Sequence, residues 1–242
     1  MKIETAVAIA PLRRESNDRS EIVSQALMGE PIVIIERQEK WSLVRLETDG
    51  YEGWMDNKQF TSGDAEESKL MLTAPISRCI SPMGECVYLP AGSWVSNSFV
   101  VEEVQPIWDA RALSLRNCAF QFLNAPYLWG GRTIMGIDCS GFSQLVFRLN
   151  GISLPRDAYQ QAEIGTIVSF VEESTTGDLA FFDNAEGRIV HVGMVLRDTK
   201  DVLHVIHASG KVRVDVMDHE GIFNRELSIY THRLRIIKRI VE

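Results

Sequence analysis

Long apolar runs are absent from this 242-residue sequence. No stretch approaches the roughly 18 consecutive apolar residues of a membrane-spanning helix. The N-terminal residues, M-K-I-E-T, also lack the basic region and apolar core of a secretory signal peptide. We therefore expect a cytoplasmic protein without a membrane span, although a chain whose export signal had been trimmed would have the same sequence.

Positive charge is also scarce. Lys and Arg total 25 against 33 Asp and Glu, which gives a net charge of -8 and a pI of about 5.2. No cluster of Lys and Arg gathers on one predicted face. Binding to nucleic acid through phosphate contacts needs such a cluster, so nucleic acid is not an expected partner.

Cysteine is sparse and follows no metal-binding pattern. The sequence has Cys79, Cys86, Cys118 and Cys139, with no C-x-x-C pair and no histidine ligands at zinc spacing. A chain of this size with 45% hydrophobic residues can bury a core without a disulfide framework. We expect four free thiols; the alternative is a disulfide between Cys79 and Cys86 in an oxidising compartment.

The first part of the chain has the texture of small β domains. Residues 1–62 contain short apolar runs, at 32–35 and 41–46, separated by the turn signals M-G-E and T-D-G. This pattern predicts a small all-β barrel. An acidic connector, S-G-D-A-E-E-S, follows, and residues 63–105 contain further short strands that predict a second barrel or an all-β linker domain.

From residue 106 the pattern changes to helices followed by strands. Helical spacing covers residues 115–123 and 139–149, and β-branched runs dominate beyond Gly177. Residues 106–242 are therefore predicted to contain helices followed by strands.

Cys139 is predicted to lie in the first turn of a helix. Asp138 is a favoured N-cap residue directly before a run whose apolar members recur at helical spacing, and Asn150-Gly151 supplies a stop. The apolar members are Phe142, Leu145, Val146 and Leu149. The positive end of a helix lowers a thiol pKa and so favours a nucleophilic thiolate. The alternative is an ordinary buried thiol.

Two histidines lie on a predicted β-hairpin. Residues 189–196 and 202–208 are apolar, β-branched runs joined by a polar loop. If Leu196 stands opposite Val202, His191 stands directly opposite His207, and His204 points to the other face. A slip of one residue would bring His204 to the His191 face instead.

A cysteine at a helix start and two histidines on a sheet suggest nucleophilic catalysis. Cys139 would attack, His191 would take the thiol proton, and His207 would orient the His191 ring. The alternatives are histidines with local structural roles, or a metal site, which would lack an acidic fourth ligand at an obvious spacing. His219 and His232 have no chemical context in the sequence and are assigned to the surface or to local structure.

The sequence resembles two known bacterial families. The NlpC-type cell-wall cysteine peptidases are matched, in order, by P-Y-L-W-G-G, D-C-S-G-F, L-P-R, G-D-L-A-F-F, H-V-G and I-H-A-S. Residues 27–55, which contain G-E, W and D-G-Y-E-G-W, resemble a bacterial SH3-like domain. The first resemblance implies a papain-like α+β core with Cys139 as nucleophile, His191 as base and His207 as third residue.

The combination of the two resembles the YkfC-like branch of these peptidases. That resemblance implies a γ-D-glutamyl-L-diamino acid endopeptidase that acts on murein peptides with a free N-terminal L-alanine. No cofactor or metal is implied, and we expect a monomer, although the sequence does not reveal whether the chain self-associates. Tyr127 is the candidate oxyanion donor; the alternative is that it packs beneath the active-site loop. The substrate-binding residues matched by motif are Asp138 and Ser140, and the further candidates are Tyr51, Glu15 and Trp129. The alternative for Tyr51 is a turn residue of the barrel, and the alternative for Glu15 is a solvated surface charge.

Ala158 departs from the branch, which often has serine at this position and would offer a hydroxyl to the substrate amine. This departure leaves the stringency for a free amine open. An amidase or acyltransferase on the same core and a non-catalytic wall-peptide-binding protein are the other functions compatible with these motifs.

Overall fold

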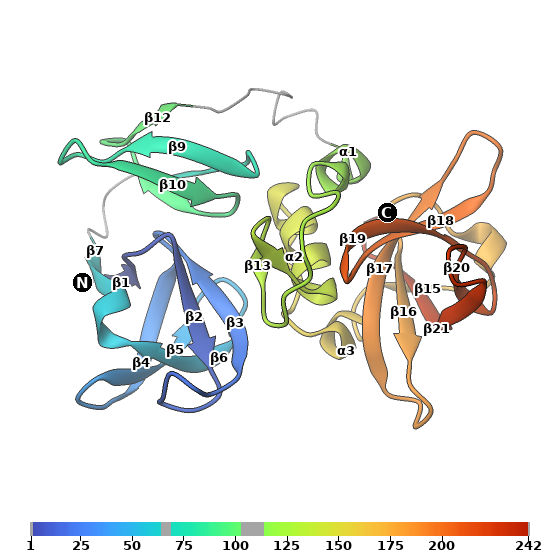
Figure 1. Ribbon diagram of the computed structural model, residues 1–242, viewed down its shortest axis with the longest axis horizontal. Helices are drawn as coiled ribbons and strands as arrows, with labels where there is room; N and C mark the ends of the chain where they lie inside the picture. The colour runs from blue at the N-terminus through green and yellow to red at the C-terminus, as the bar shows by residue number, and fades with distance from the viewer. Residues whose placement is uncertain (1, 64–68, 103–113, 242) are drawn as a thin grey trace. The chain divides into compact units, whose positions relative to one another are not determined.

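The computed structural model describes residues 2–63, 69–102 and 114–241, and Figure 1 shows its elements. This part of the chain forms two compact units. The first comprises residues 2–63, 69–102 and 128–134, and the second comprises residues 114–127 and 135–241. The predicted boundary at 62–63 adjoins residues 64–68, which lie outside the described residues, as does the boundary at 105–106.

The first unit is built on a curled antiparallel sheet. Its strands are β1 (Lys2–Thr5), β2 (Ile9–Arg13), β3 (Ile22–Leu27), β4 (Pro31–Arg37), β5 (Trp41–Leu46), β6 (Glu52–Asp56) and β7 (Phe60–Gly63), in the order β3-β2-β6-β5-β4-β1-β7. A short 3-10 helix, Asn57–Gln59, precedes β7. Alternate residues of β2 and β5 are buried, as expected for strands with one face on a core. Leu12, Val44 and Leu46 are among the fully buried members of that core.

Two smaller sheets follow in the same unit. Their strands are β8 (Lys69–Met71), β9 (Ile76–Ile80), β10 (Cys86–Pro90), β11 (Trp94–Ser96) and β12 (Val100–Glu102), paired as β10-β9-β12 and β11-β8. Leu72, Cys79, Leu89 and Val95 form a small core between them. These short strands need that shared core, because isolated two-stranded pairs are marginal in water.

The segment Leu128–Ile134, which contains β13 (Arg132–Thr133), belongs to the first unit although residues 114–127 of the second unit precede it along the chain. The buried guanidinium of Arg132 pairs with the buried carboxylate of Glu30 at 3.1 and 3.2 Å. The Arg132 backbone N–H also donates to Gln25 at 2.8 Å. Gly130 allows the close approach, because a Cβ there would lie 2.5 Å from the Ile22 carbonyl oxygen. The segment Leu128–Ile134 is thus fixed to the first sheet.

The second unit combines short helices with a seven-stranded sheet. Its helices are α1 (Leu115–Phe120), α2 (Cys139–Leu149), α3 (Ala158–Gln161) and a 3-10 turn, Val171–Glu173. Its strands are β14 (Gly136–Ile137), β15 (Thr166–Val168), β16 (Leu179–Asp183), β17 (Ile189–Arg197), β18 (Leu203–Ser209), β19 (Lys211–Met217), β20 (Gly221–Asn224) and β21 (Ile229–Arg239). The predicted α+β class is confirmed.

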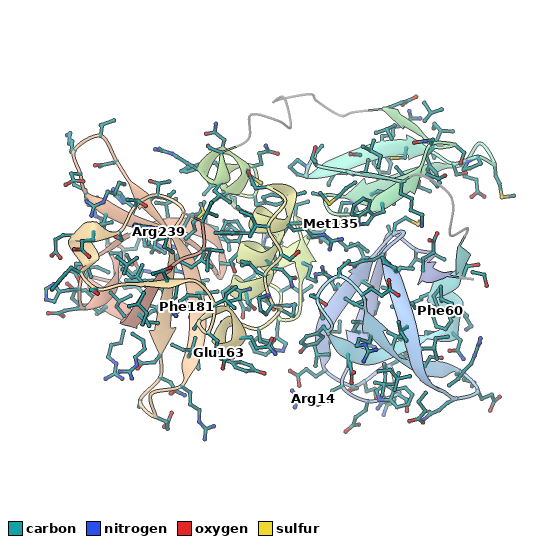
Figure 2. The ribbon with its side chains drawn as sticks, turned by 180° about the vertical axis from the view of Figure 1, so that it is seen from behind. Arg14, Phe60, Met135, Glu163, Phe181 and Arg239 are labelled. Carbon is teal, nitrogen blue, oxygen red and sulfur yellow. The ribbon has the colours of Figure 1, made fainter. Side chains whose placement is uncertain are left out.

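The large sheet closes on itself. Its order is β15-β21-β16-β17-β18-β19-β20, and β20 also pairs with β21. Inside the closure lies an apolar cluster that includes Phe182, Val195, Val205 and Ile222. Phe181, labelled in Figure 2, is fully buried on the opposite face of β16, because adjacent side chains of a strand alternate between faces.

Helix α2 has the predicted start and end. Asp138 caps it, with its carboxylate accepting a hydrogen bond of 2.7 Å from the Gly141 N–H, and Gly151 follows the C-cap with a φ of 79°. The predicted apolar face is buried. The other faces are buried as well, because α2 packs against α1, α3, β17 and β18. Polar residues on those faces are hydrogen-bonded, for example Ser143 to Gln161 at 2.7 Å.

All four cysteines are free thiols, including Cys79 and Cys86, which lie on the paired strands β9 and β10.

Helix α1 is shorter than its spacing predicts, because the chain turns after Phe120. In the described ranges, no helix has both the length and the apolar character to cross a membrane.

Candidate active site

Cys139 is the first residue of α2 and is buried. The backbone N–H groups of Val192 and Ser140 both point at its sulfur. Val192 directly follows His191 on β17. The structure therefore brings the thiol to the strand position next to the predicted base.

His191 and His207 are buried and hydrogen-bonded to each other, with His191 Nε2 2.7 Å from His207 Nδ1. They lie on the face of β17 and β18 that also carries Val195 and Val205, so they sit at the end of the closed sheet. Gly193 lies between them on that face. A Cβ at Gly193 would lie 2.9 Å from the His207 Cβ, so glycine leaves room for the His207 ring.

The predicted hairpin register is wrong by two residues. Leu196 pairs with His204 and Arg197 with Leu203, so His207 lies diagonal to His191 and not opposite it. The cause is the turn: Asp198 Oδ1 accepts hydrogen bonds from the N–H groups of Lys200 and Val202, which closes the loop one residue later on each strand. A shift of two residues preserves the face, and the histidines still meet.

Asp215 extends the pair by one member. On β19, its Oδ2 lies 3.0 Å from His207 Nε2, and Arg213 holds the same carboxylate from the other side at 2.7 and 2.8 Å. Burial acts to raise the pKa of Asp215, but hydrogen bonds from His207 and Arg213 outweigh it and lower the pKa below its usual value. Asp215 is therefore ionised at neutral pH and can only accept hydrogen bonds.

An ionised Asp215 determines the tautomers of both histidines. His207 Nε2 must donate to Asp215, which makes His207 Nδ1 an acceptor. His191 Nε2 must then donate to His207, which leaves His191 Nδ1 unprotonated. The carboxylate thus leaves a basic nitrogen on His191 that is not used by the pair and is available to a thiol.

His232 lies beside this pair, contrary to its assignment as a residue without chemical context. Its ring stacks on His191, with 4.2 Å between centroids and 28° between planes. β21 pairs with both β16 and β20, which brings His232 to the end of the sheet where His191 lies. Burial and the nearby His207 lower the pKa of His232 to about 4, so it is neutral near pH 7.

The thiol and its base are both neutral in the free protein. Burial, and next the charge of Asp138, raise the pKa of Cys139 to about 12. Burial, His207 and His232 hold the pKa of His191 well below its usual value. The predicted lowering of the thiol pKa by the helix start is therefore wrong, because burial is the larger effect. Proton transfer to His191 must accompany the attack on a substrate.

We expect alkylation of Cys139 by iodoacetamide to be slow at pH 7 and to accelerate with pH up to about pH 10 without a plateau, because only the thiolate reacts quickly and its pKa is about 12. The rate is measured by mass spectrometry of the Cys139 peptide in a Cys86→Ala variant, which lacks the exposed thiol. A plateau with a midpoint below pH 7 would instead show a preformed thiolate–imidazolium pair.

Asp138 and Ser140 meet a buried arginine. Arg156 donates to both oxygens of Asp138, at 3.0 and 2.6 Å, and to the Ser140 hydroxyl at 2.8 Å. Tyr127 lies close enough to Cys139 and Asp138 for their charges to act on it. Burial and those charges raise the pKa of Tyr127 to about 12, so its hydroxyl keeps its proton and can donate it to an oxyanion.

Three of the predicted substrate-binding residues lie in the first unit. Trp129 is exposed and donates from Nε1 to Glu21 at 2.6 Å. Tyr51 is partly buried against the core of the first sheet, and Glu15 is exposed in the loop after β2. Their roles stay predictions. Ala158, where a hydroxyl is missing, begins α3 in the second unit and is buried.

Sequence reasoning missed Asp215, Arg156 and His232. A signal for Asp215 was present in the sequence. Apolar and polar residues alternate in K-V-R-V-D-V-M, as in a strand, and this run directly follows Gly210, so it would pair with the strand that carries His207. Arg156 stood in the L-P-R motif without a stated role. His232 gave no local signal, since its position depends on how the sheet closes.

Two segments of the chain match known protein families. Residues 124–230 match the NlpC/P60 family, and residues 12–60 match the bacterial dipeptidyl-peptidase SH3 domain. The chain is 30% identical to a γ-D-glutamyl-L-lysine dipeptidyl-peptidase of Bacillus subtilis, over 85% of this chain and 79% of that protein. It is 26% identical to a protein of the same name from Bacillus cereus, over 84% and 72% of the two chains.

A solved structure has the same fold. The crystal structure of an NlpC/P60 family protein from Bacillus cereus superimposes with a TM-score of 0.78, covers 100% of both chains and is 21% identical in sequence. That likeness extends over the SH3-like region and the α+β domain together.

Proposed function

This chain belongs to the NlpC/P60 family of cysteine peptidases, and on that premise we propose that it cleaves the γ-D-glutamyl to L-diamino acid bond of peptidoglycan-derived peptides. L-Lysine is the expected diamino acid, because two relatives are named for it. The observation that supports the reaction most strongly is the buried His191–His207–Asp215 series beside the Cys139 thiol. We assign the activity to the recycling of short freed peptides in the cytoplasm.

The reaction begins with transfer of the thiol proton from Cys139 to His191 Nδ1 as sulfur bonds to the amide carbon. The carbonyl oxygen becomes an oxyanion, for which Tyr127 and the Cys139 backbone N–H are the proposed donors. The C–N bond then breaks as His191 gives the proton to the leaving amine. Water, deprotonated by His191, cleaves the thioester and releases L-Ala-D-Glu.

The charge that forms on His191 has a route for stabilisation. When Nδ1 takes the proton, the ring becomes an imidazolium that donates through Nε2 to His207, which donates in turn to Asp215. The buried carboxylate is the negative end of this series. The interaction is stronger in the charged transition state than in the neutral resting state, which is the condition for raising kcat.

Recognition of a free N-terminal amine is the second part of the proposal. Asp138 and Ser140, next to the nucleophile, accept hydrogen bonds from the substrate ammonium, and Tyr51, Glu15 and Trp129 are the candidates from the first unit. Arg156 neutralises part of the Asp138 charge. Asp138 alone therefore supplies less binding energy than an unpaired carboxylate would, and amine recognition needs a further acceptor.

We expect L-Ala-γ-D-Glu-L-Lys to be cleaved at least about tenfold faster, in kcat/KM, than its N-acetylated form, because acetylation removes the positive charge that Asp138 and a further acceptor would bind. Lysine release by each peptide is measured by chromatography. Equal kcat/KM for the two peptides would reject amine recognition while leaving the peptidase activity in place.

A further inference from the structure

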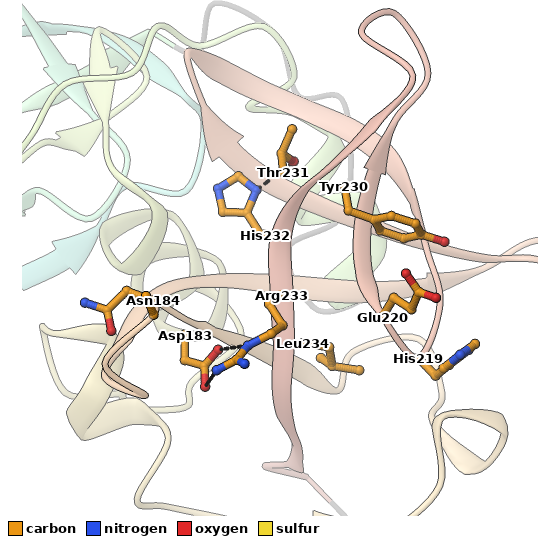
Figure 3. A pocket seen from close by; sticks show the side chains of 10 residues that line it. Asp183, Asn184, His219, Glu220, Tyr230, Thr231, His232, Arg233 and Leu234 are labelled. Carbon is orange, nitrogen blue, oxygen red and sulfur yellow. Dashed lines mark hydrogen bonds and ion pairs between the residues drawn. The ribbon is translucent and has the colours of Figure 1, made fainter.

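A cavity of about 740 Å³ opens at the end of the closed sheet, within the second unit (Figure 3). Its walls come from the end of β16 and the two residues after it, from residues 219–220 between β19 and β20, and from residues 230–234 of β21. This volume lies within the range of pockets that hold small ligands. The sequence motifs and the proposed chemistry use none of these walls.

The cavity adjoins the proposed base through one ring. His232 is part of its wall, and the same ring stacks on His191 at 4.2 Å between centroids. His191 must deliver a proton to the leaving amine, so that amine lies within hydrogen-bond reach of His191. The same His232 ring therefore contacts both the cavity and the proposed base that serves the leaving amine.

The wall presents charges of both signs. Arg233 is held in place by Asp183, whose buried carboxylate accepts from Nε at 2.7 Å and from Nη2 at 2.9 Å, as the dashed lines in Figure 3 show. The Nη1 group of Arg233 has no hydrogen-bond acceptor within the described ranges, and 64% of the side chain is exposed. Glu220 is exposed, and its carboxylate forms no ion pair in that part of the chain.

We propose that this cavity receives the departing diamino acid, with Arg233 facing its carboxylate and Glu220 facing its side-chain ammonium. The assignment rests on the proposed function, because only cleavage before a diamino acid brings these two groups to this place. A residue with a carboxylate and a distal ammonium matches a wall with one arginine and one glutamate. An aliphatic residue would leave Glu220 facing a methyl group.

The test compares three tripeptides that differ in the leaving residue. L-Ala-γ-D-Glu is joined to L-lysine, to L-norleucine, which lacks the ammonium, or to L-lysinamide, which lacks the carboxylate, and kcat/KM is measured for each with the wild-type protein. We expect both changes to lower kcat/KM by roughly threefold or more, as for exposed ion pairs. Glu220→Gln is expected to lower the lysine-to-norleucine ratio by roughly threefold.

Glu172→Gln is the matched control, since Glu172 is exposed on the 3-10 turn and does not line the cavity. It should leave the ratio at the wild-type value. Equal kcat/KM for the three peptides, or the same ratio in Glu220→Gln as in the control, would overturn the assignment and leave the proposed function standing. Cleavage of none of the three by the wild type would overturn both.

Discussion

Replacement of Cys139 by alanine abolishes hydrolysis of L-Ala-γ-D-Glu-L-Lys, with an expected loss in kcat of at least about 10⁴-fold, as for removal of the nucleophile of other covalent hydrolases. The reason is that the Cys139 sulfur is the group proposed to form the acyl intermediate: it is buried at the start of α2, against the strand that carries His191. Lysine release is measured over hours at high enzyme concentration.

Binding separates this result from unfolding. The variant should retain affinity for the intact tripeptide, measured by calorimetry, because the recognition groups are unchanged. Cys86→Ala is the control for loss of a thiol, since Cys86 is exposed and lies in the first unit. It should keep the wild-type kcat. A wild-type protein that binds the tripeptide and never cleaves it would favour the alternative of a non-catalytic binding protein.

Replacement of Asp215 by asparagine lowers kcat by about 10²-fold or more, with a much smaller change in KM. Arg213 donates to the side-chain oxygens at this position, so the amide of asparagine turns its NH₂ group toward His207. His207 Nε2 must then accept, and the tautomers of both histidines reverse. His191 Nδ1 carries a proton in that state and cannot take one from the thiol.

Asp198→Asn is the matched control for Asp215→Asn. Asp198 lies in the turn that joins β17 to β18, and its replacement removes the same charge, but its oxygens hold that turn and do not contact the histidine pair. This control should keep kcat, and both variants should keep a cooperative thermal transition. A loss in Asp215→Asn that appears in KM, or one matched by the control, would mean that Asp215 acts only on the fold.

The helix that carries the nucleophile could be predicted because its signals are local. An N-cap residue, an apolar period and an Asn-Gly stop all lie within 14 residues, and the structure begins and ends α2 where they indicate. For the hairpin, the sequence could predict which side chains share a face but not the register of the two strands. Its register depends on how the Asp198 side chain closes the turn, which alternation along the strands does not reveal.

The protonation states could not be predicted from spacing. A helix start and a nearby histidine both favour a thiolate, yet the completed structure buries the Cys139 thiol and the His191 imidazole, and burial favours the neutral form of each. The degree of burial follows from the closure of β20 on β21 and from the packing of α2 on all sides. Both depend on contacts between segments far apart along the chain.

The contact between His232 and His191 could not be predicted for the same reason. β21 is eleven residues long and pairs with β15, β16 and β20, so it closes the sheet and brings His232 onto His191. No spacing between position 191 and position 232 indicates that contact. The position of Asp215 depends on less, since a single tight turn at Gly210 places it beside His207.

The central claim is that the Cys139 sulfur forms a covalent bond to the γ-carbonyl carbon of the D-glutamyl residue. Rapid acid quench of the wild-type protein with L-Ala-γ-D-Glu-L-Lys, followed by mass spectrometry, tests it most directly. We predict an adduct of the mass of L-Ala-D-Glu, less one water, on the peptide that contains Cys139, together with one equivalent of released lysine. Lysine release without any adduct, or an adduct on another residue, would contradict the account.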